Sequence, residues 1–89
     1  MNKQFDIGWL VKSKQGRDKD EIYFIVGFDG DKVLLANGQA KLLSSPKRKN
    51  KRHLELLSCN EIIQEKLKND IKVFDAEIYS NIKKYKENI

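Results

Sequence analysis

Cysteine, proline and histidine each occur once in this 89-residue sequence, and their scarcity excludes several classes of protein. A lone cysteine cannot form an internal disulfide, which excludes a small secreted protein whose fold is stabilised by disulfide bonds. One histidine and one cysteine supply only two of the three or four side chains of a typical zinc site. The longest apolar run, Ile22–Val26, is far shorter than the roughly 20 residues of a membrane span.

Recognisable targeting and cofactor signals are also missing. Met1 is followed by Asn-Lys-Gln-Phe-Asp, which has no apolar core of a signal peptide. The sequence contains no Gly-rich phosphate loop, no Walker lysine and no HExxH motif. We therefore expect a cytoplasmic protein with no cofactor, no metal, no membrane and no small-molecule substrate.

Acidic residues are absent between Asp31 and Glu55, where seven Lys or Arg residues occur. The rest of the chain has eleven basic and thirteen acidic residues, so the net charge of +5 comes entirely from this stretch. Positive charge gathered in one segment favours a polyanionic partner. Lys47–Arg52 carries five of these charges behind Ser44-Ser45-Pro46, and we expect a solvent-extended loop that binds phosphates. The alternative is a lysine run that only keeps the protein soluble.

Short apolar runs rich in β-branched and aromatic residues predict strands in the first part of the chain. Asn37-Gly38 is a strong hairpin signal, because both residues accept positive φ. Tight turns are expected at Lys14–Lys19 and Asp29–Asp31. A small SH3-like β barrel over residues 1–57, with the basic loop at 44–53, is the predicted fold. Its strands would cover residues 9–11, 22–26, 33–36, 40–43 and 54–56.

The apolar spacing becomes helical after residue 57, which predicts a helical extension over 58–89. Ser58 and Glu61 fit a capping box for a helix over 60–69. Asp75 is the expected N-cap of a second helix that runs to Asn88. Its apolar face would consist of Ile78, Ile82, Tyr85 and Ile89. Such short helices should be stable only when packed on the barrel or on a partner.

Catalysis has little support in the sequence. His53 and Cys59 could form a nucleophile–base pair, yet nothing supplies a third group or an oxyanion site. The simpler interpretation of Cys59 is a small apolar residue at a helix start. We therefore expect no enzymatic activity. Four aromatic residues could stack on bases, although aromatics in strands of a small chain usually belong to the core: Trp9, Tyr23, Phe24 and Phe28.

Residues Gly8–Lys19, followed by the apolar strand Ile22–Gly27, resemble a KOW motif, which has a glycine in its first hairpin turn flanked by basic residues. Three further features occur in order: Val33–Gly38, the Pro-Lys-rich segment ending at Leu54, and the tail with Asp75–Ile78. Together they resemble small bacterial KOW-domain RNA-binding proteins, which are similar to a KOW ribosomal protein of archaeal and eukaryotic large subunits. The resemblance covers nearly the whole chain.

This resemblance implies an SH3-like barrel that binds RNA without catalysis. Gly16 would be the KOW glycine, and Arg17 and Lys19 would touch RNA from the tip of the turn. Asp20 stands where the pattern usually has glycine, which puts a carboxylate at the tip and moves the expected contact towards the lysine-rich segment. The candidate RNA-binding residues are Lys14, Gly16, Arg17, Lys19, Lys41, Lys47, Arg48, Lys49, Lys51, Arg52 and His53.

The sequence therefore predicts a ribosome-associated protein that binds structured ribosomal RNA or the large subunit, with ribosomal proteins as further partners. Neutralising about five phosphates predicts a log–log salt slope of about −3.5 to −4.5. The alternative is an adaptor of the translation or transcription machinery that docks proteins through its barrel or its helical tail.

Overall fold

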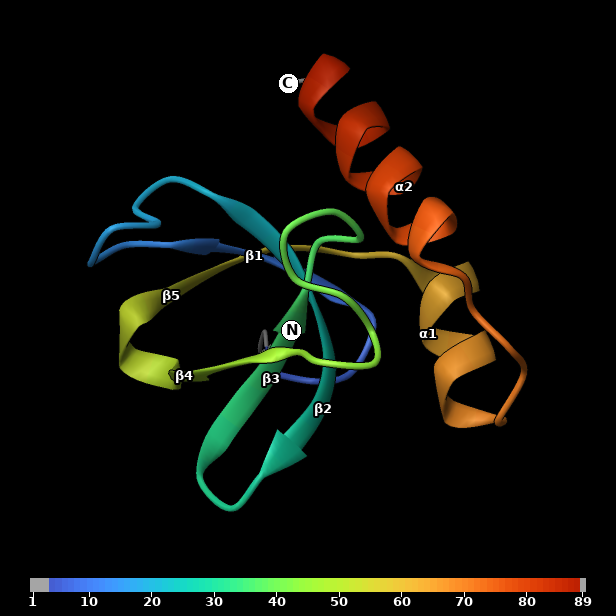
Figure 1. Cartoon of the computed structure of the whole chain (residues 1–89), viewed down its shortest axis with the longest axis horizontal. Helices are drawn as coiled ribbons and strands as arrows, with labels where there is room; N and C mark the ends of the chain where they lie inside the picture. Colours follow the sequence, from blue (N-terminus) through green and yellow to red (C-terminus); the bar gives the residue numbers. More distant parts are fainter. Residues whose placement is uncertain (1–3, 89) are drawn as a thin grey trace.

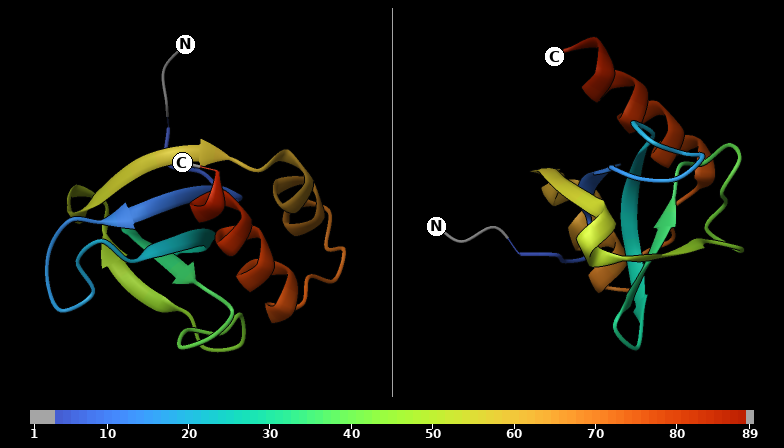
Figure 2. Two further views of the ribbon diagram at one scale, coloured as in Figure 1. Left: turned by 90° about the horizontal axis from the view of Figure 1, so that it is seen from above. Right: turned by 90° about the vertical axis from the view of Figure 1, so that its left-hand side faces the viewer.

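The computed structural model describes residues 4–88 and consists of a small antiparallel β barrel followed by two helices (Figure 1). The predicted fold class is confirmed. The five strands follow the order β4-β3-β2-β1-β5 in one bent sheet (Figure 2). The elements are β1 (Trp9–Ser13), β2 (Ile22–Asp29), β3 (Lys32–Ala36), β4 (Lys47–Asn50), a 3-10 turn η1 (Lys51–His53), β5 (Leu54–Cys59), α1 (Glu61–Lys68) and α2 (Asp75–Glu87).

The unbroken apolar start of β2 reflects a strand that is covered on both faces. Successive side chains of a strand point to opposite faces. Phe24 faces the helices, whereas its neighbours Tyr23 and Ile25 face the barrel interior, and all three are buried. The hydrophobic core therefore has two layers separated by β1 and β2.

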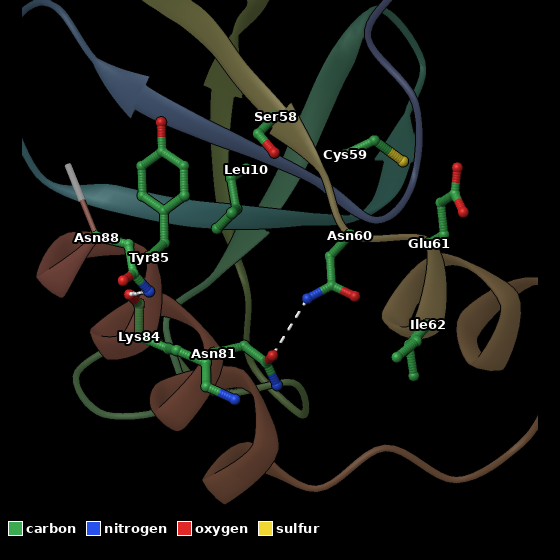
Figure 3. A pocket seen from close by; sticks show the side chains of 10 residues that line it. All are labelled: Leu10, Ser58, Cys59, Asn60, Glu61, Ile62, Asn81, Lys84, Tyr85 and Asn88. Carbon is green, nitrogen blue, oxygen red and sulfur yellow. Dashed lines mark hydrogen bonds between the residues drawn. The ribbon is translucent and has the colours of Figure 1, made fainter.

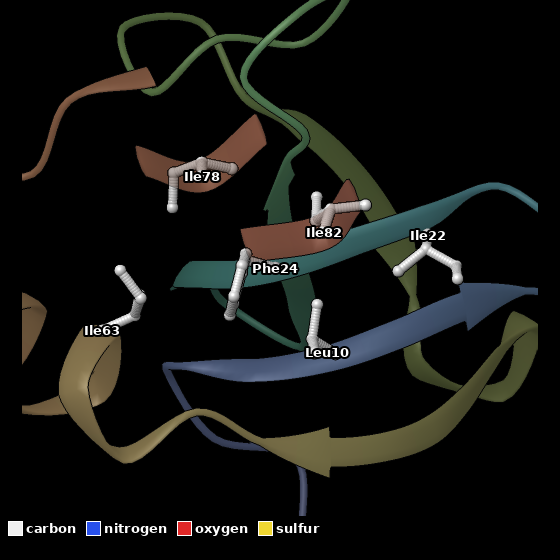
Figure 4. Packing of buried hydrophobic residues seen from close by; sticks show 6 residues of the cluster. All are labelled: Leu10, Ile22, Phe24, Ile63, Ile78 and Ile82. Carbon is white, nitrogen blue, oxygen red and sulfur yellow. The ribbon is translucent and has the colours of Figure 1, made fainter. Parts of the chain in front are cut away.

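The outer layer lies between the sheet and the two helices (Figure 4). Its buried residues are Leu10, Ile22, Phe24, Ile63, Ile78 and Ile82. The inner layer fills the barrel and consists of Val11, Tyr23, Ile25, Val33, Leu35 and Leu54. Ile78 and Ile82 confirm the predicted buried face of α2, with Tyr85 packed beside them; Ile89 lies outside the described residues.

One predicted strand is wrong and one predicted loop is a strand. Residues 40–43 form no strand, and the connection 37–46 contains a single isolated bridge between Leu42 and Ser45. The strand that pairs with β3 is instead β4, in the register Leu35↔Lys47 to Lys32↔Asn50. Lys47–Asn50 is therefore not a solvent-extended loop, because β3 has an edge to pair and the strand buries part of each lysine side chain.

The helix caps also differ from the predicted ones. Asn60, rather than Ser58, caps α1, since its side-chain oxygen accepts from the backbone nitrogen of Ile63 at 3.1 Å. Ser58 belongs to β5, which pairs with β1 as far as Cys59. Asp75 is the first residue of α2 and not its cap, and its carboxylate accepts from the backbone nitrogen of Leu43 at 2.8 Å.

Both helices are fixed to the barrel at glycines. Gly8 has φ +90°, and a Cβ there would lie 2.5 Å from the Cα of Gln64 in α1. Gly38 has φ +76°, and a Cβ there would overlap the carbonyl oxygen of Asp75 in α2. Since real side chains cannot approach backbone so closely, only glycine permits this docking. The helices pack on the barrel, as one of the two sequence-based alternatives proposed.

Candidate nucleic-acid interface

The Asp18 carboxylate connects the β1–β2 turn to the basic strand β4. Its two oxygens accept from Lys47 Nζ at 2.8 Å and from Lys49 Nζ at 2.6 Å. Ser13 Oγ donates to the same carboxylate at 2.9 Å, and the Tyr23 hydroxyl donates at 3.0 Å. Asp18 therefore gathers groups from β1, β2 and β4 at one end of the barrel.

Burial and hydrogen bonding have opposite effects on the pKa of the Asp18 carboxyl. Burial alone would raise the pKa of the Asp18 carboxyl, yet the hydrogen bonds from Lys47, Lys49, Ser13 and Tyr23 hold this pKa well below its usual range. Burial and the adjacent Asp18 carboxylate both raise the pKa of the Tyr23 hydroxyl. The carboxylate thus stays ionised and the phenol stays protonated, which preserves the network.

The turn over residues 14–20 lies against the segment 47–53. Lys49 Nζ donates to the Gln15 carbonyl at 2.9 Å, and the Lys14 backbone nitrogen donates to the His53 carbonyl at 2.8 Å. We call these two segments, residues 14–20 and 47–53, the basic end; Figures 1 and 2 place it at the opposite end of the barrel from α1. The basic end contains eight Lys or Arg residues and two acidic residues.

The conformation of the turn depends on two residues with positive φ. Gly16 has φ +90°, in agreement with its predicted place in the turn. Asp20 has φ +74°, a left-handed conformation that glycine adopts most easily and that aspartate tolerates. This explains why a glycine would suit position 20. Arg17 and Lys19 are exposed on the same turn.

The five cations of residues 47–52 fall into three groups by their ion pairs. Lys47 and Lys49 share Asp18, and their side chains retain 30% and 10% of their exposure. Arg48 points outwards and pairs with Asp29 at 2.6 Å on the surface. Among residues 4–88, Lys51 and Arg52 form no ion pair. The five basic residues that the sequence treats as equivalent therefore differ in their availability to a phosphate.

A shallow groove of about 680 Å³ runs along the segment 47–53, which we call the basic segment, and is lined almost entirely by basic side chains. Lys32 lies in β3 opposite Asn50 and was not among the predicted site residues, although it belongs to the acid-free stretch. The groove is lined by Lys32, Lys47, Arg48, Lys49, Asn50, Arg52 and His53.

One predicted site residue is not brought to the basic end. Lys41 lies in the connection 37–46, where its backbone carbonyl accepts from Asn37 and Gly38. This connection packs on the start of α2 through Gly38 and Leu43.

The aromatic residues separate clearly into core and surface. Tyr23 and Phe24 are buried, and Trp9 packs against the inner layer. Phe28, at the end of β2, is 41% exposed, and Lys51 Nζ lies 5.7 Å from the centre of its ring. Phe28 is thus the one of the four candidate stacking residues that is exposed.

The Cys59–His53 pair gains no support from the geometry. His53 directly precedes β5 and Cys59 is its last residue, and six strand residues span about 20 Å. Burial, with the charges of Glu61 and Asp6, raises the pKa of the Cys59 thiol, which is opposite to the shift that activates a nucleophile. Cys59 instead lines a cleft of about 490 Å³ between β5 and α2, in which Asn60 donates to Asn81 at 3.2 Å (Figure 3).

Neither a family model nor a curated protein matches this chain. Within residues 4–88, no group of three or more His, Cys, Asp or Glu side chains could hold a metal ion. Over the same residues, no helix has both the length and the apolar character that crossing a membrane requires.

Proposed function

We propose that this chain is a non-catalytic RNA-binding protein whose basic end binds RNA phosphates. The observation that carries the proposal is the Asp18 network, because it joins the turn 14–20 to the segment 47–53 in one positively charged surface. The resemblance to KOW-domain proteins supports structured ribosomal RNA, and the large ribosomal subunit in particular, as the target.

The ion pairs indicate which side chains contribute most to the affinity. A lysine that already shares a buried carboxylate gains less from a phosphate than an exposed cation does. Arg17, Lys51 and Arg52 should therefore contribute more than Lys47 and Lys49, whose role is to position the turn. About three or four phosphate contacts give a log–log salt slope of about −2 to −3.6, shallower than the sequence alone predicts.

The basic end can be tested with two variants that lose the same charge. The first replaces Arg17, Lys51 and Arg52 by Gln, and the second replaces Lys83, Lys84 and Lys86 of α2 by Gln; all six side chains are exposed. Binding to a structured ribosomal RNA fragment is measured over a range of salt concentrations. The first variant should flatten the salt slope by about 2 to 3, and the second should leave it nearly unchanged. An affinity of the unaltered protein that does not depend on salt would contradict the proposal.

Gradient sedimentation of a cell lysate tests the target. The protein should co-migrate with large ribosomal subunits at low salt and leave them at high salt. The Arg17/Lys51/Arg52 variant should leave them at lower salt than the α2 variant does. Sedimentation with no subunit at any salt concentration would exclude ribosomal RNA as the target.

A second candidate function, a protein-docking adaptor, is favoured by apolar side chains exposed on the helical part. Ile62 is 70% exposed and Phe74 is 58% exposed. Ile71 and Tyr79, in the same part of the chain, are also exposed. Replacement of Ile62 and Phe74 by Ser separates the functions, because an adaptor would lose its association with ribosomes, whereas an RNA-binding protein would keep this association and its affinity for purified RNA.

A further inference from the structure

Phe28 is placed where a nucleotide bound to the basic segment could meet it. The residue is the last but one of β2 and lies opposite Val33, which in turn lies opposite Lys49 of β4. Its ring is 41% exposed, with Lys51 Nζ 5.7 Å from the ring centre. The next residue, Asp29, pairs with Arg48. An aromatic face therefore lies beside the segment 47–53, whose cations would hold a phosphate backbone.

A second phenylalanine provides an internal comparison. Phe74 is 58% exposed, and Lys72 Nζ lies 5.4 Å from its ring centre, so the aromatic–lysine contact is nearly the same. An aspartate follows directly in both cases, Asp29 after Phe28 and Asp75 after Phe74. The wider surroundings differ, because the Glu77 carboxylate accepts from the Phe74 backbone nitrogen and from Lys66 Nζ, whereas Phe28 lies beside the segment 47–53, which has five Lys or Arg residues and no acidic residue. The surplus of cations that a phosphate backbone needs is therefore larger around Phe28 than around Phe74.

We propose that Phe28 is a stacking platform for an unpaired RNA base, with Lys51 holding the adjacent phosphate. This inference rests on the proposed function and narrows its ligand from RNA in general to RNA with an accessible base, such as a loop or a bulge. Bases in a regular duplex are stacked on each other and cannot reach the ring, whereas unpaired bases stack readily on aromatic side chains.

The contact between Lys51 and Phe28 is weak enough for an RNA base to replace the Lys51 ammonium on the ring. At 5.7 Å the ammonium lies near the outer limit of a cation–π contact, and such a contact at an exposed site is weaker than stacking of a base. When RNA arrives, the ammonium can move from the ring to the phosphate, which is a stronger charged partner. The base then takes the ring face that Lys51 leaves.

The test compares two RNA hairpins that differ by one unpaired base. One hairpin is fully paired, and the other carries a single bulged 2-aminopurine, whose fluorescence is quenched on stacking. The unaltered protein should bind the bulged hairpin about tenfold more tightly and quench its fluorescence. Phe28→Leu should bring the two affinities to within about twofold and abolish the quenching. Phe28→Trp should keep both effects, and Phe74→Leu is the control that should behave as the unaltered protein.

The outcomes separate the two proposals. If the unaltered protein binds neither hairpin, the proposed function fails. If it binds both with a normal salt dependence but Phe28→Leu retains the preference and the quenching, RNA binding stands and the stacking platform is overturned. Equal weakening of both hairpins by Phe28→Leu would also overturn it, because Phe28 would then support the fold and not a base.

Discussion

At the basic end, the turn 14–20 is held to β4 by a carboxylate, two ammonium groups and two hydroxyls around Asp18. At the helical end, which comprises α1, α2 and the connection 69–74, the helices are held by buried isoleucines and by backbone contacts at Gly8 and Gly38. One barrel thus carries a polar attachment and an apolar attachment at different places. Charge and packing can therefore be altered separately in this protein.

The largest effect is expected at the helical end. Ile78 is completely buried in the outer layer, so Ile78→Ala should lower the free energy of unfolding by about 4 kcal/mol through lost burial and a cavity. Urea unfolding measures this loss, which should not depend on salt. Ile62→Ala, on the exposed side of α1, should change stability by less than about 0.5 kcal/mol. Equal losses for the two variants would mean that α2 is not held by its buried face.

The next largest effect is expected when the polar attachment around Asp18 is removed. Asp18→Asn leaves the ammonium of Lys49, whose side chain is only 10% exposed, without its anionic partner. We expect a loss of about 2–3 kcal/mol in the free energy of unfolding, slightly discounted for the exposure of Lys47. Asp29→Asn is the matched control, since the pair of Asp29 with Arg48 is well exposed and should be worth less than about 1 kcal/mol. Similar losses for both variants would contradict a special role of Asp18.

The pH dependence of stability should distinguish the two attachments. The pKa of Asp18 in the folded protein is lowered from an ordinary value of 3.8, so the folded state favours the ionised carboxylate. Its stabilisation is therefore complete above the unfolded-state pKa and is lost as the pH falls through the folded-state pKa. Between pH 7 and pH 2 the free energy of unfolding should fall less steeply for Asp18→Asn than for the unaltered protein. Parallel curves would exclude Asp18 as a source of the acid sensitivity.

The smallest effect is expected at two aspartates with positive φ, one at the basic end and one at the helical end. Asp20 has φ +74° and Asp70 has φ +56°. Asp20→Gly and Asp70→Gly should each raise the free energy of unfolding by about 0.5 kcal/mol, because glycine relieves the left-handed strain. Only Asp20→Gly removes a carboxylate from the basic end, so only this variant should also tighten RNA binding. A loss of stability in either variant would indicate a side-chain contact that outweighs the strain.

Local sequence patterns predict the barrel and the buried face of α2 because both depend on the periodicity of apolar residues. The β4 strand escapes such patterns, since Lys-Arg-Lys-Asn has little intrinsic preference for a strand. It forms because β3 has an edge to pair and because Asp18, about 30 residues earlier in the chain, accepts its lysines. Such long-range electrostatic pairing has no local signature.

The helix caps illustrate a choice between two acceptable residues. Ser58 and Asn60 can both cap a helix, and local chemistry does not decide between them. The pairing of β5 with β1 as far as Trp9↔Cys59 decides it, because it keeps Ser58 extended and leaves Asn60 at the helix start. The candidate site follows the same logic: the sequence identifies the basic segment, and only the fold shows which of its cations are already paired.

The outer layer of the core has a consequence for synthesis of the chain. Leu10 and Phe24 are made early, whereas their partners Ile78 and Ile82 belong to the last helix of the chain. A nascent chain that has completed all five strands therefore still exposes an apolar face of β1 and β2 to water. The growing polypeptide therefore has an exposed apolar surface that favours aggregation until residue 82 has been made and α2 can cover it.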